Sequence, residues 1–201
     1  MPGSSSAAKT RTRLSPEARK NQLLDVSKDM IIEHGLQEFS IEALARTAQV
    51  SSPLVYTYFD SRLDVLRSLL AREYLGYTTK LMAELEDADS FETVVRLNVE
   101  SNFDHFAAGN IIPILESQPE IASVIQSEAE AYGRKLARYL VRAAADTYKL
   151  NKRQAELLVK MSSGASIAAA QYASLGRMSR QTAVDAAHSY IIAGLERSAE
   201  Q

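Results

Sequence analysis

The sequence predicts an all-α fold of about nine helices, with an N-terminal three-helix head and a C-terminal helical body. Apolar residues recur at intervals of three and four along the chain, which is the period of an amphipathic helix. Serine or asparagine precedes most of these segments, where a side-chain oxygen can cap a helix. We find no convincing strand pattern.

Composition limits the class of protein. The chain has 201 residues, 46% of them hydrophobic, which is enough for a sizeable core in one or two domains. The absence of cysteine excludes disulfides and thiolate metal sites. The N-terminal residues lack the apolar run of a secretory signal, and the segment "GASIAAAQYASLG" is too short and too polar to span a bilayer. We therefore expect a soluble, cytoplasmic protein.

Positive charge is concentrated at the N-terminus, although the formal net charge of the chain is −2. Lys9, Arg11 and Arg13 lie in a segment rich in serine and alanine, and Arg19 and Lys20 follow shortly after. This pattern predicts a flexible basic arm over residues 1–14 that contacts nucleic acid. A tail without a binding role remains the alternative.

Each of the first three helices has its own start signal, and the second and third are short. Ser15-Pro16-Glu17 begins the first helix, which ends at Gly35. Ser40 caps the second helix, and Ser52-Pro53 begins the third, which we expect to end near Phe59.

The remaining helices are longer. The fourth helix begins at Ser61 and continues without proline to about Ala83. Downstream we expect a helix over residues 91–107 capped by Ser90, a short piece bracketed by Pro113 and Pro119, and long helices over about 119–150, 151–175 and 180–195.

Two short helices joined by a tight turn are typical of a helix-turn-helix, whose second helix enters the DNA major groove. Leu44, Ala45, Val50 and Val55 are suited to hold this pair against the first helix. The other face of the third helix is then left for DNA, and we expect Phe59 to fill its junction with the fourth helix.

These residues resemble the tetracycline-repressor (TetR) family of bacterial transcription regulators. The resemblance rests on a gap-free series over the head: Ser40, Ile41, Leu44, Ala45, Ala48-Gln49-Val50-Ser51, Val55-Tyr56, Tyr58-Phe59 and Ser61-Arg62. It implies a DNA-binding domain over residues 15–62, with the helix-turn-helix at about 40–59. Residues 63–201 are then a regulatory and dimerisation domain, and the helix at about 61–83 connects the two.

Two positions depart from the family pattern. Gln49 replaces the usual glycine at a turn that favours positive φ, at a cost of about 1 kcal/mol. Arg62 replaces the usual lysine at a position that contacts phosphate, which keeps the charge and adds a planar fork.

The resemblance also assigns DNA contacts. Near the groove it places Ser51, Ser52, Pro53, Leu54, Tyr56 and Thr57, in which hydroxyls offer hydrogen bonds and Pro53 and Leu54 offer apolar contact. Tyr56, Tyr58 and Arg62 are better suited to phosphates.

Small residues repeat at helical spacing in the last two helices. The stripes are Ala155, Leu158, Ser162, Ala165, Ser166 and Ala169, and then Ala183, Ala186, Ala187, Tyr190, Ile191 and Gly194. The family resemblance favours a homodimer through these helices over packing within one chain. A two-fold dimer requires a palindromic operator.

Polar residues interrupt the apolar face of the helix at 91–107. Asn98, Asn102 and His105 lie at i, i+4 and i+7, beside Phe103 and Phe106. Buried polar groups need partners, so these residues either bond to neighbouring helices or line a pocket for a small, largely apolar effector. The resemblance raises the second alternative, because family members commonly bind effectors in this region.

Catalytic alternatives are weak. No nucleophile elbow, P-loop, dinucleotide fingerprint or zinc-protease motif occurs, and the three histidines lack ligand spacing. We therefore expect no enzyme, metal or cofactor. The predicted function is a dimeric transcriptional regulator, a repressor released from double-stranded DNA by an effector. The alternatives are a DNA-binding protein controlled by a protein partner or by no small molecule and, remotely, a helical enzyme.

Overall fold

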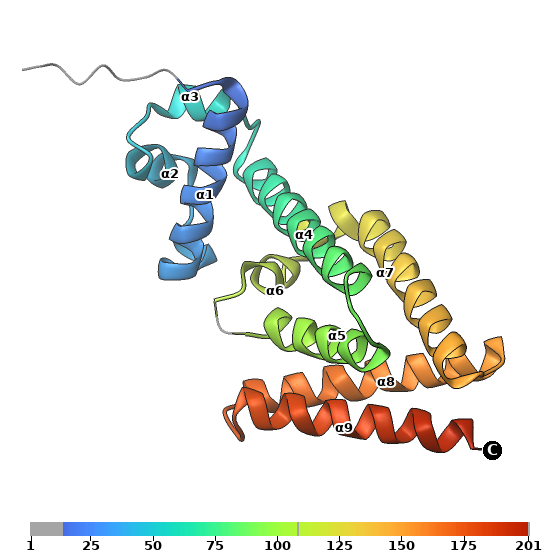
Figure 1. Ribbon diagram of the computed structural model, residues 1–201. Coiled ribbons are helices and arrows are strands. Elements are labelled where there is room, and N and C mark those ends of the chain that lie inside the picture. The colour runs from blue at the N-terminus through green and yellow to red at the C-terminus, as the bar shows by residue number, and fades with distance from the viewer. Residues whose placement is uncertain (1–13, 108, 201) are drawn as a thin grey trace, which may run out of the picture. The chain divides into compact units, whose positions relative to one another are not determined.

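The computed structural model describes residues 14–107 and 109–200 (Figure 1). Over these residues it contains nine α-helices, one short 3₁₀ helix and no strand, so the predicted all-α fold is confirmed. The chain divides into two compact units, Met1–Val65 and Leu66–Gln201, which we call the head and the body. Lys9, Arg11 and Arg13 lie outside the described residues.

The head contains α1 (Pro16–His34), the 3₁₀ helix η1 (Leu36–Glu38), α2 (Ile41–Thr47) and α3 (Ser52–Tyr56). Serine caps the first two α-helices: Ser15 Oγ accepts from the Ala18 amide over 3.2 Å, and Ser40 Oγ from the Ala43 amide over 3.1 Å. At Gly35 the backbone takes φ 84°, a conformation that glycine adopts without steric cost, and α1 ends there.

The third helix differs from the prediction at both ends. Its N-cap is Ser51, not Ser52, because the extended backbone at Ser51 precedes the first helical residue. It ends at Tyr56, not near Phe59, although the amides of Tyr58 and Phe59 still donate to the Val55 carbonyl. The helix is one turn long, so its position depends on packing.

The head has an apolar core that holds α2 and α3. Leu44, Val55 and Phe59 are at most 1% exposed, and Ala45 is also buried. Val50 is half-buried. Other members of this core are Leu23, Leu24, Met30, Ile31, Phe39, Ile41, Ala48 and Val65.

The fourth helix, α4 (Arg62–Glu86), begins in the head and continues into the body. Ser61 Oγ accepts from the Asp64 amide over 3.1 Å, as the predicted cap requires. The helix extends three residues beyond the predicted end at Ala83.

The body continues with α5 (Phe91–His105), α6 (Ile111–Glu116), α7 (Pro119–Tyr148), α8 (Lys152–Ser174) and α9 (Arg180–Ala199). Ser90 and Ser179 cap α5 and α9, and Asn151 forms a reciprocal capping box with Gln154. Pro113 lies within the first turn of α6, where a missing amide hydrogen costs no helical bond. The last helix runs past the predicted end at Leu195.

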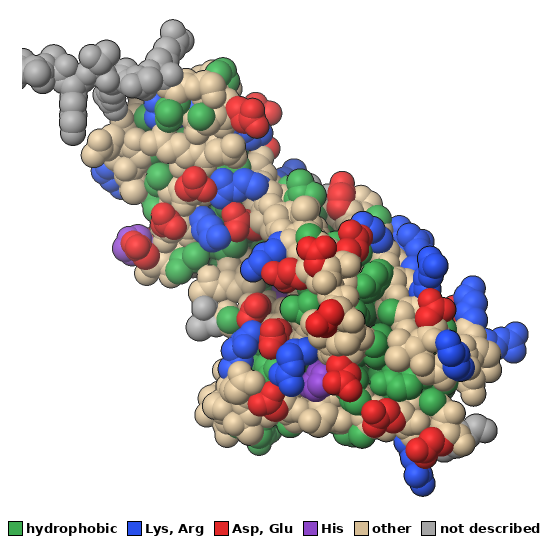
Figure 2. All heavy atoms as spheres, in the orientation of Figure 1, with side chains coloured by type: hydrophobic (Ala, Val, Ile, Leu, Met, Phe, Trp, Pro, Cys, Tyr) green, Lys and Arg blue, Asp and Glu red, His purple; other side chains and the backbone are tan. Residues whose placement is uncertain are grey.

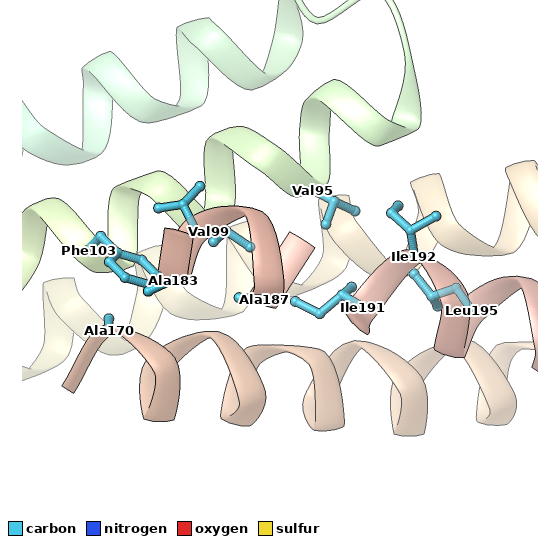
Figure 3. Close-up of a cluster of buried hydrophobic side chains, with 10 residues drawn as sticks. Val95, Val99, Phe103, Ala170, Ala183, Ala187, Ile191, Ile192 and Leu195 are labelled. Atoms are coloured by element: carbon cyan, nitrogen blue, oxygen red, sulfur yellow. The ribbon is translucent and has the colours of Figure 1, made fainter. Parts of the chain in front are cut away.

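The centre of the body is a cluster between α5, α8 and α9. Figure 3 shows Val95, Val99 and Phe103 of α5 directed toward Ala183, Ala187 and Ile191 of α9, with Ala170 of α8 beside them. Small residues let the α8 and α9 backbones lie side by side, as Figure 1 shows.

Five of the twelve residues in the pattern predicted for a dimer are therefore buried within one chain. Ala155, Ser166, Ala183, Ala187 and Ile191 are at most 6% exposed in the single protomer. The sequence could not separate the two uses, because a stripe of small residues suits close packing against any helix.

Candidate functional site

The turn between α2 and α3 has the tight form of a helix-turn-helix. Gln49 adopts φ 55°, the left-handed conformation expected for this position. The Val50 amide then donates to the Ala45 carbonyl over 2.9 Å, which closes the turn. The two helices are thereby fixed on one short connection.

The outer face of α3 is available to a partner. Ser51, Pro53, Tyr56 and Thr57 are exposed, and Ser52, Leu54 and Tyr58 are half-buried. Tyr56, 50% exposed, is one of the large hydrophobic side chains at the surface of the head. The Ser51 side chain makes no capping hydrogen bond, so its hydroxyl is not committed to the helix.

Thr57 has a hydroxyl that is already used as a donor. Its Oγ1 donates to the Pro53 carbonyl over 3.1 Å, one turn back along the chain. The lone pairs of Oγ1 remain as acceptors, and its methyl group remains exposed. In a DNA groove, these groups suit an amine of adenine or cytosine and the methyl group of thymine.

Arg62 makes contacts that the sequence did not predict. Its Nε donates to the Phe39 carbonyl over 2.7 Å and its Nη2 to the Leu36 carbonyl over 2.8 Å. The guanidinium carbon also lies 5.8 Å from the centre of the Phe39 ring. Arg62 therefore joins the start of α4 to η1 and the residue after it, with two of its five N–H donors.

Arg46 is a cation that the sequence interpretation did not select. It lies in the last turn of α2, directly before the turn to α3, and its side chain is exposed. Its position next to the helix-turn-helix connection could have marked it as a DNA contact. A basic residue at a helix C-terminus is, however, common because it interacts favourably with the helix dipole.

Comparisons with known proteins bear on the head directly. Residues 23–69 match the model of "Bacterial regulatory proteins, tetR family", over the segment that contains the helix-turn-helix. The head of the chain is of the tetR type. The match includes α2, the turn and α3, so the exposed face of α3 belongs to the segment that resembles this family.

Two curated transcription regulators are similar to parts of this chain. It is 25% identical over 126 residues to the HTH-type transcriptional activator FasR of Mycolicibacterium smegmatis, covering 59% of this chain and 57% of FasR. It is 36% identical over 103 residues to the HTH-type transcriptional regulator LuxR of Vibrio harveyi, covering 41% and 50%. The chain thus spans little more than half the length of these relatives.

The fold of the whole chain also has solved counterparts. The fatty acid degradation regulator FadR of Bacillus halodurans superposes with a TM-score of 0.67 at 22% identity, covering 89% of this chain and 96% of that one. At this identity the likeness establishes the TetR-like fold of head and body.

The five residues predicted to line an effector pocket do not surround one cavity. Phe103 is 5% exposed in the α5–α8–α9 core, and Phe106 packs against the same cluster. Asn102 Nδ2 donates to Ser166 Oγ over 2.9 Å, and His105 Nε2 lies 3.7 Å from Glu116 Oε2. Two of the three polar residues thus have partners on neighbouring helices. This arrangement is the alternative to an effector pocket that the sequence left open.

Asn98 is the exception, because it lines a cavity between α5, α7, α8 and α9. The cavity has a volume of about 30 Å³, and its other walls include Phe91, Val95, Ser162 and Ile191. A space of this size holds a water molecule or two. It is too small for an effector of ordinary size.

In residues 14–107 and 109–200, no group of three or more histidine, aspartate or glutamate side chains has the arrangement of a metal site. No helix in the same ranges combines the length and apolar character needed to cross a membrane.

Proposed function

We propose that the protein is a dimeric transcriptional regulator that binds a palindromic operator in double-stranded DNA through α3 and represses transcription until a small, largely apolar effector releases it. The observation that carries this proposal is the exposed face of α3 within a tetR-family helix-turn-helix. Ser51, Ser52, Leu54 and Thr57 are the proposed groove contacts, and Pro53 adds apolar surface.

Phosphate contacts come from the surroundings of that face. Tyr56 and Tyr58 flank α3, and Arg46 is exposed at the end of α2. We retain Lys9, Arg11 and Arg13 as contacts of a basic arm, on the basis of their charge. Arg62 supports the backbone between η1 and α4 with two of its five N–H donors, and its other N–H groups are proposed to contact phosphate.

The homodimer is proposed through the exposed faces of α8 and α9. Leu157 and Met161 are 60% and 59% exposed, and Gly164 and Ala168 continue their stripe at a 4-3-4 spacing. On α9, Ala186, Tyr190 and Ala193 form a similar exposed stripe, with Tyr190 70% exposed. Two copies of these stripes suit a four-helix interface with two-fold symmetry.

Repression is the default form of regulation, because occupancy of a promoter is sufficient for it. The relative FasR is named a transcriptional activator. Activation of transcription is therefore the alternative consequence of the same DNA binding. A second candidate is a DNA-binding protein controlled by a protein partner, and the close packing around Asn102 and His105 favours it.

The test begins with selection of operator sequences from a random DNA library by the full-length protein. A palindrome with half-sites about 34–36 Å apart is expected. A promoter carrying that palindrome upstream of a reporter should be silenced by the protein in vitro. Enrichment of no sequence would contradict the DNA-binding proposal, and increased transcription would replace repression by activation.

Deletion of residues 1–13 tests the arm in the same assay. Loss of three phosphate contacts should reduce the slope of log affinity against log salt by about 2–3. An unchanged slope would show that these residues make no phosphate contact.

A further inference from the structure

Positive charge is concentrated around the junction of α7 and α8. Residues 134–156 contain seven lysine or arginine residues and two acidic residues, so their net charge is +5, whereas the whole chain has a net charge of −2. All seven cations are exposed: Arg134, Lys135, Arg138, Arg142, Lys149, Lys152 and Arg153. Figure 2 shows lysine and arginine side chains along α7. We call this part of the body the basic surface.

Acidic neighbours neutralise little of this charge. Three of the seven cations form an ion pair with a carboxylate one turn away on the same helix, at 3.5–3.8 Å: Arg134 with Glu130, Arg142 with Asp146 and Lys152 with Glu156. Exposed pairs of this length contribute little to stability. Arg138 forms no ion pair or hydrogen bond with any residue that the structure describes. The basic surface is therefore able to attract a negatively charged partner.

The spacing of the cations opposes the stability of the helices that carry them. Arg134, Arg138 and Arg142 follow one another at intervals of four residues on α7, where like charges repel. Lys152 and Arg153 are the first two residues of α8, where the positive end of the helix dipole disfavours a cation. Helix stability therefore does not account for the basic surface, and an acidic partner would offset this repulsion.

A groove of about 520 Å³ lies within the basic surface, between α7 and the start of α8. Its lining consists of a row of small apolar side chains, Ala137, Val141 and Ala145, and of the charged side chains Arg138, Arg142, Lys152 and Glu156. The apolar row has an interval of four residues, so it follows one face of α7. Small side chains allow another helix to approach closely. The groove thus combines an apolar row with cations beside it.

The groove and the proposed dimer interface lie on different sides of α8. At about 100° per residue, Lys152 and Glu156 are at least about 100° around the helix from Leu157 and Met161. Dimerisation through Leu157 and Met161 therefore uses other residues than the groove does.

We propose that this groove docks an acidic amphipathic helix of a partner protein. The apolar residues of that helix, three and four positions apart, lie along Ala137, Val141 and Ala145, and its carboxylates pair with Arg138 and Arg142. Duplex DNA has the same sign of charge, but its phosphate backbone has no apolar ridge to fill the row. The inference goes beyond DNA binding by α3, which does not depend on it, and gives the chemistry of the partner in the second candidate function.

The probe is a synthetic helical peptide of about 18 residues, five turns long, with leucine at every third or fourth position and glutamate beside the leucines. Its binding to the full-length protein is followed by fluorescence anisotropy in about 50 mM salt, where exposed charges are weakly screened. We expect a dissociation constant below about 100 μM. A second peptide with glutamine in place of every leucine keeps the charge and should not bind measurably, because it cannot fill the apolar row.

Arg138→Glu tests the charge of the groove. It should weaken binding of the leucine peptide by about ten-fold or more, because an attraction becomes a repulsion. Arg177→Glu makes the same change of charge beyond the other end of α8 and should alter the affinity by less than about two-fold. Urea unfolding should find Arg138→Glu at least as stable as the parent, because the substitution replaces two like-charge pairs on α7 by pairs of opposite charge.

Three results overturn the proposal: no binding of the leucine peptide, equal binding of the glutamine peptide, or equal affinity of Arg138→Glu and the parent. Two other occupants are tested with the same variant. Weaker binding of a random-sequence duplex by Arg138→Glu, with unchanged peptide binding, would assign the basic surface to DNA. A smaller assembly of Arg138→Glu in analytical ultracentrifugation, with unchanged peptide binding, would assign it to a second copy of the chain.

Operator binding by the unsubstituted protein is measured separately, without the peptide. Failure to bind any operator contradicts the proposed function and leaves the peptide result standing. Operator binding together with failure to bind the leucine peptide overturns only the docking groove.

Discussion

The guanidinium of Arg62 lies over the ring of Phe39 and donates a 2.7 Å hydrogen bond to the Phe39 carbonyl oxygen. A second bond reaches the Leu36 carbonyl, so one side chain donates to the first residue of η1 and to the residue that follows it. A lysine cannot reproduce this fork, because its ammonium carries all three N–H donors on one nitrogen atom and lacks the planar spread of a guanidinium. The first residue of α4 therefore stabilises the loop that leads into α2.

This relationship predicts that Arg62→Lys reduces stability although it keeps the charge. We expect the free energy of unfolding to fall by about 1 kcal/mol. This is less than a buried charge-assisted hydrogen bond contributes, because solvent weakens bonds that are partly exposed. Urea unfolding followed by circular dichroism measures the effect. Arg46→Lys is the matched control and should change stability little; an Arg62→Lys protein as stable as the parent would show that the fork contributes nothing.

The positive φ of Gln49 predicts a difference between glycine and alanine at that position. Gln49→Gly and Gln49→Ala both remove the side-chain amide. The difference between their free energies of unfolding therefore measures the strain that a Cβ atom causes at φ 55°. The glycine variant should be more stable by about 1 kcal/mol. Equal midpoints of chemical unfolding would indicate that the turn relaxes to a negative φ.

The geometry of Thr57 predicts a change of DNA preference. Thr57→Val keeps the branched shape and removes the acceptor lone pairs, and Leu54→Ala removes apolar contact. Both should alter the ranking of operator variants at one base pair each, by about 1–3 kcal/mol. The readout is a fluorescence-anisotropy panel of single-base operator variants.

Arg46→Ala serves as the contrasting variant in that panel. It should weaken binding to all operators alike and lower the salt slope by about 1. The reverse result, with Arg46 changing preference and Thr57 not, would mean that α3 is rotated differently in the groove.

The exposed stripe on α8 predicts the effect of a charge at its centre. Met161→Glu places a carboxylate among side chains that we assign to the dimer interface, so it should yield monomers with much weaker operator binding. Analytical ultracentrifugation measures the assembly state. Thr147→Glu, on the exposed surface of α7, is the control for added charge; dimers of Met161→Glu would place the interface elsewhere.

The buried tyrosines predict a loss of stability in alkaline solution. Burial raises the pKa of Tyr132 above its ordinary value, and Tyr74 and Tyr77 shift in the same direction. As pH rises through about 10, the unfolded chain loses these protons while the folded chain keeps them, so the free energy of unfolding falls. Urea unfolding between pH 8 and pH 11 should show this loss, and Tyr132→Phe should make it shallower than Tyr172→Phe does.

Helix boundaries were largely predictable, because the signals that set them are local. Ser15, Ser40, Ser61, Ser90 and Ser179 each accept a hydrogen bond from an amide three residues later, as the sequence indicated. The error at Ser51 and Ser52 arose where two adjacent serines both satisfy the local rule. The choice between them depends on how Val55 enters the core of the head.

The sequence predicted which residues form the candidate DNA-binding face, but it did not predict the contacts that each of them makes. Spacing alone identifies which residues of α3 lie opposite Val55, and the structure finds Ser51, Pro53, Tyr56 and Thr57 exposed. The Arg62 fork depends on carbonyls more than twenty residues away, which no local pattern encodes.

The sequence by itself determined the all-α class, the helix-turn-helix and the caps, because these depend on side chains within one or two turns of each other. Only the tertiary structure decided which polar groups find partners. Asn102 of α5 bonds to Ser166 of α8, whereas the buried Tyr132 hydroxyl has no hydrogen-bond partner in the part of the chain that the structure describes. Helical spacing determines which side chains lie on the same face of one helix. Their hydrogen bonds depend also on which helix packs against that face and at what distance.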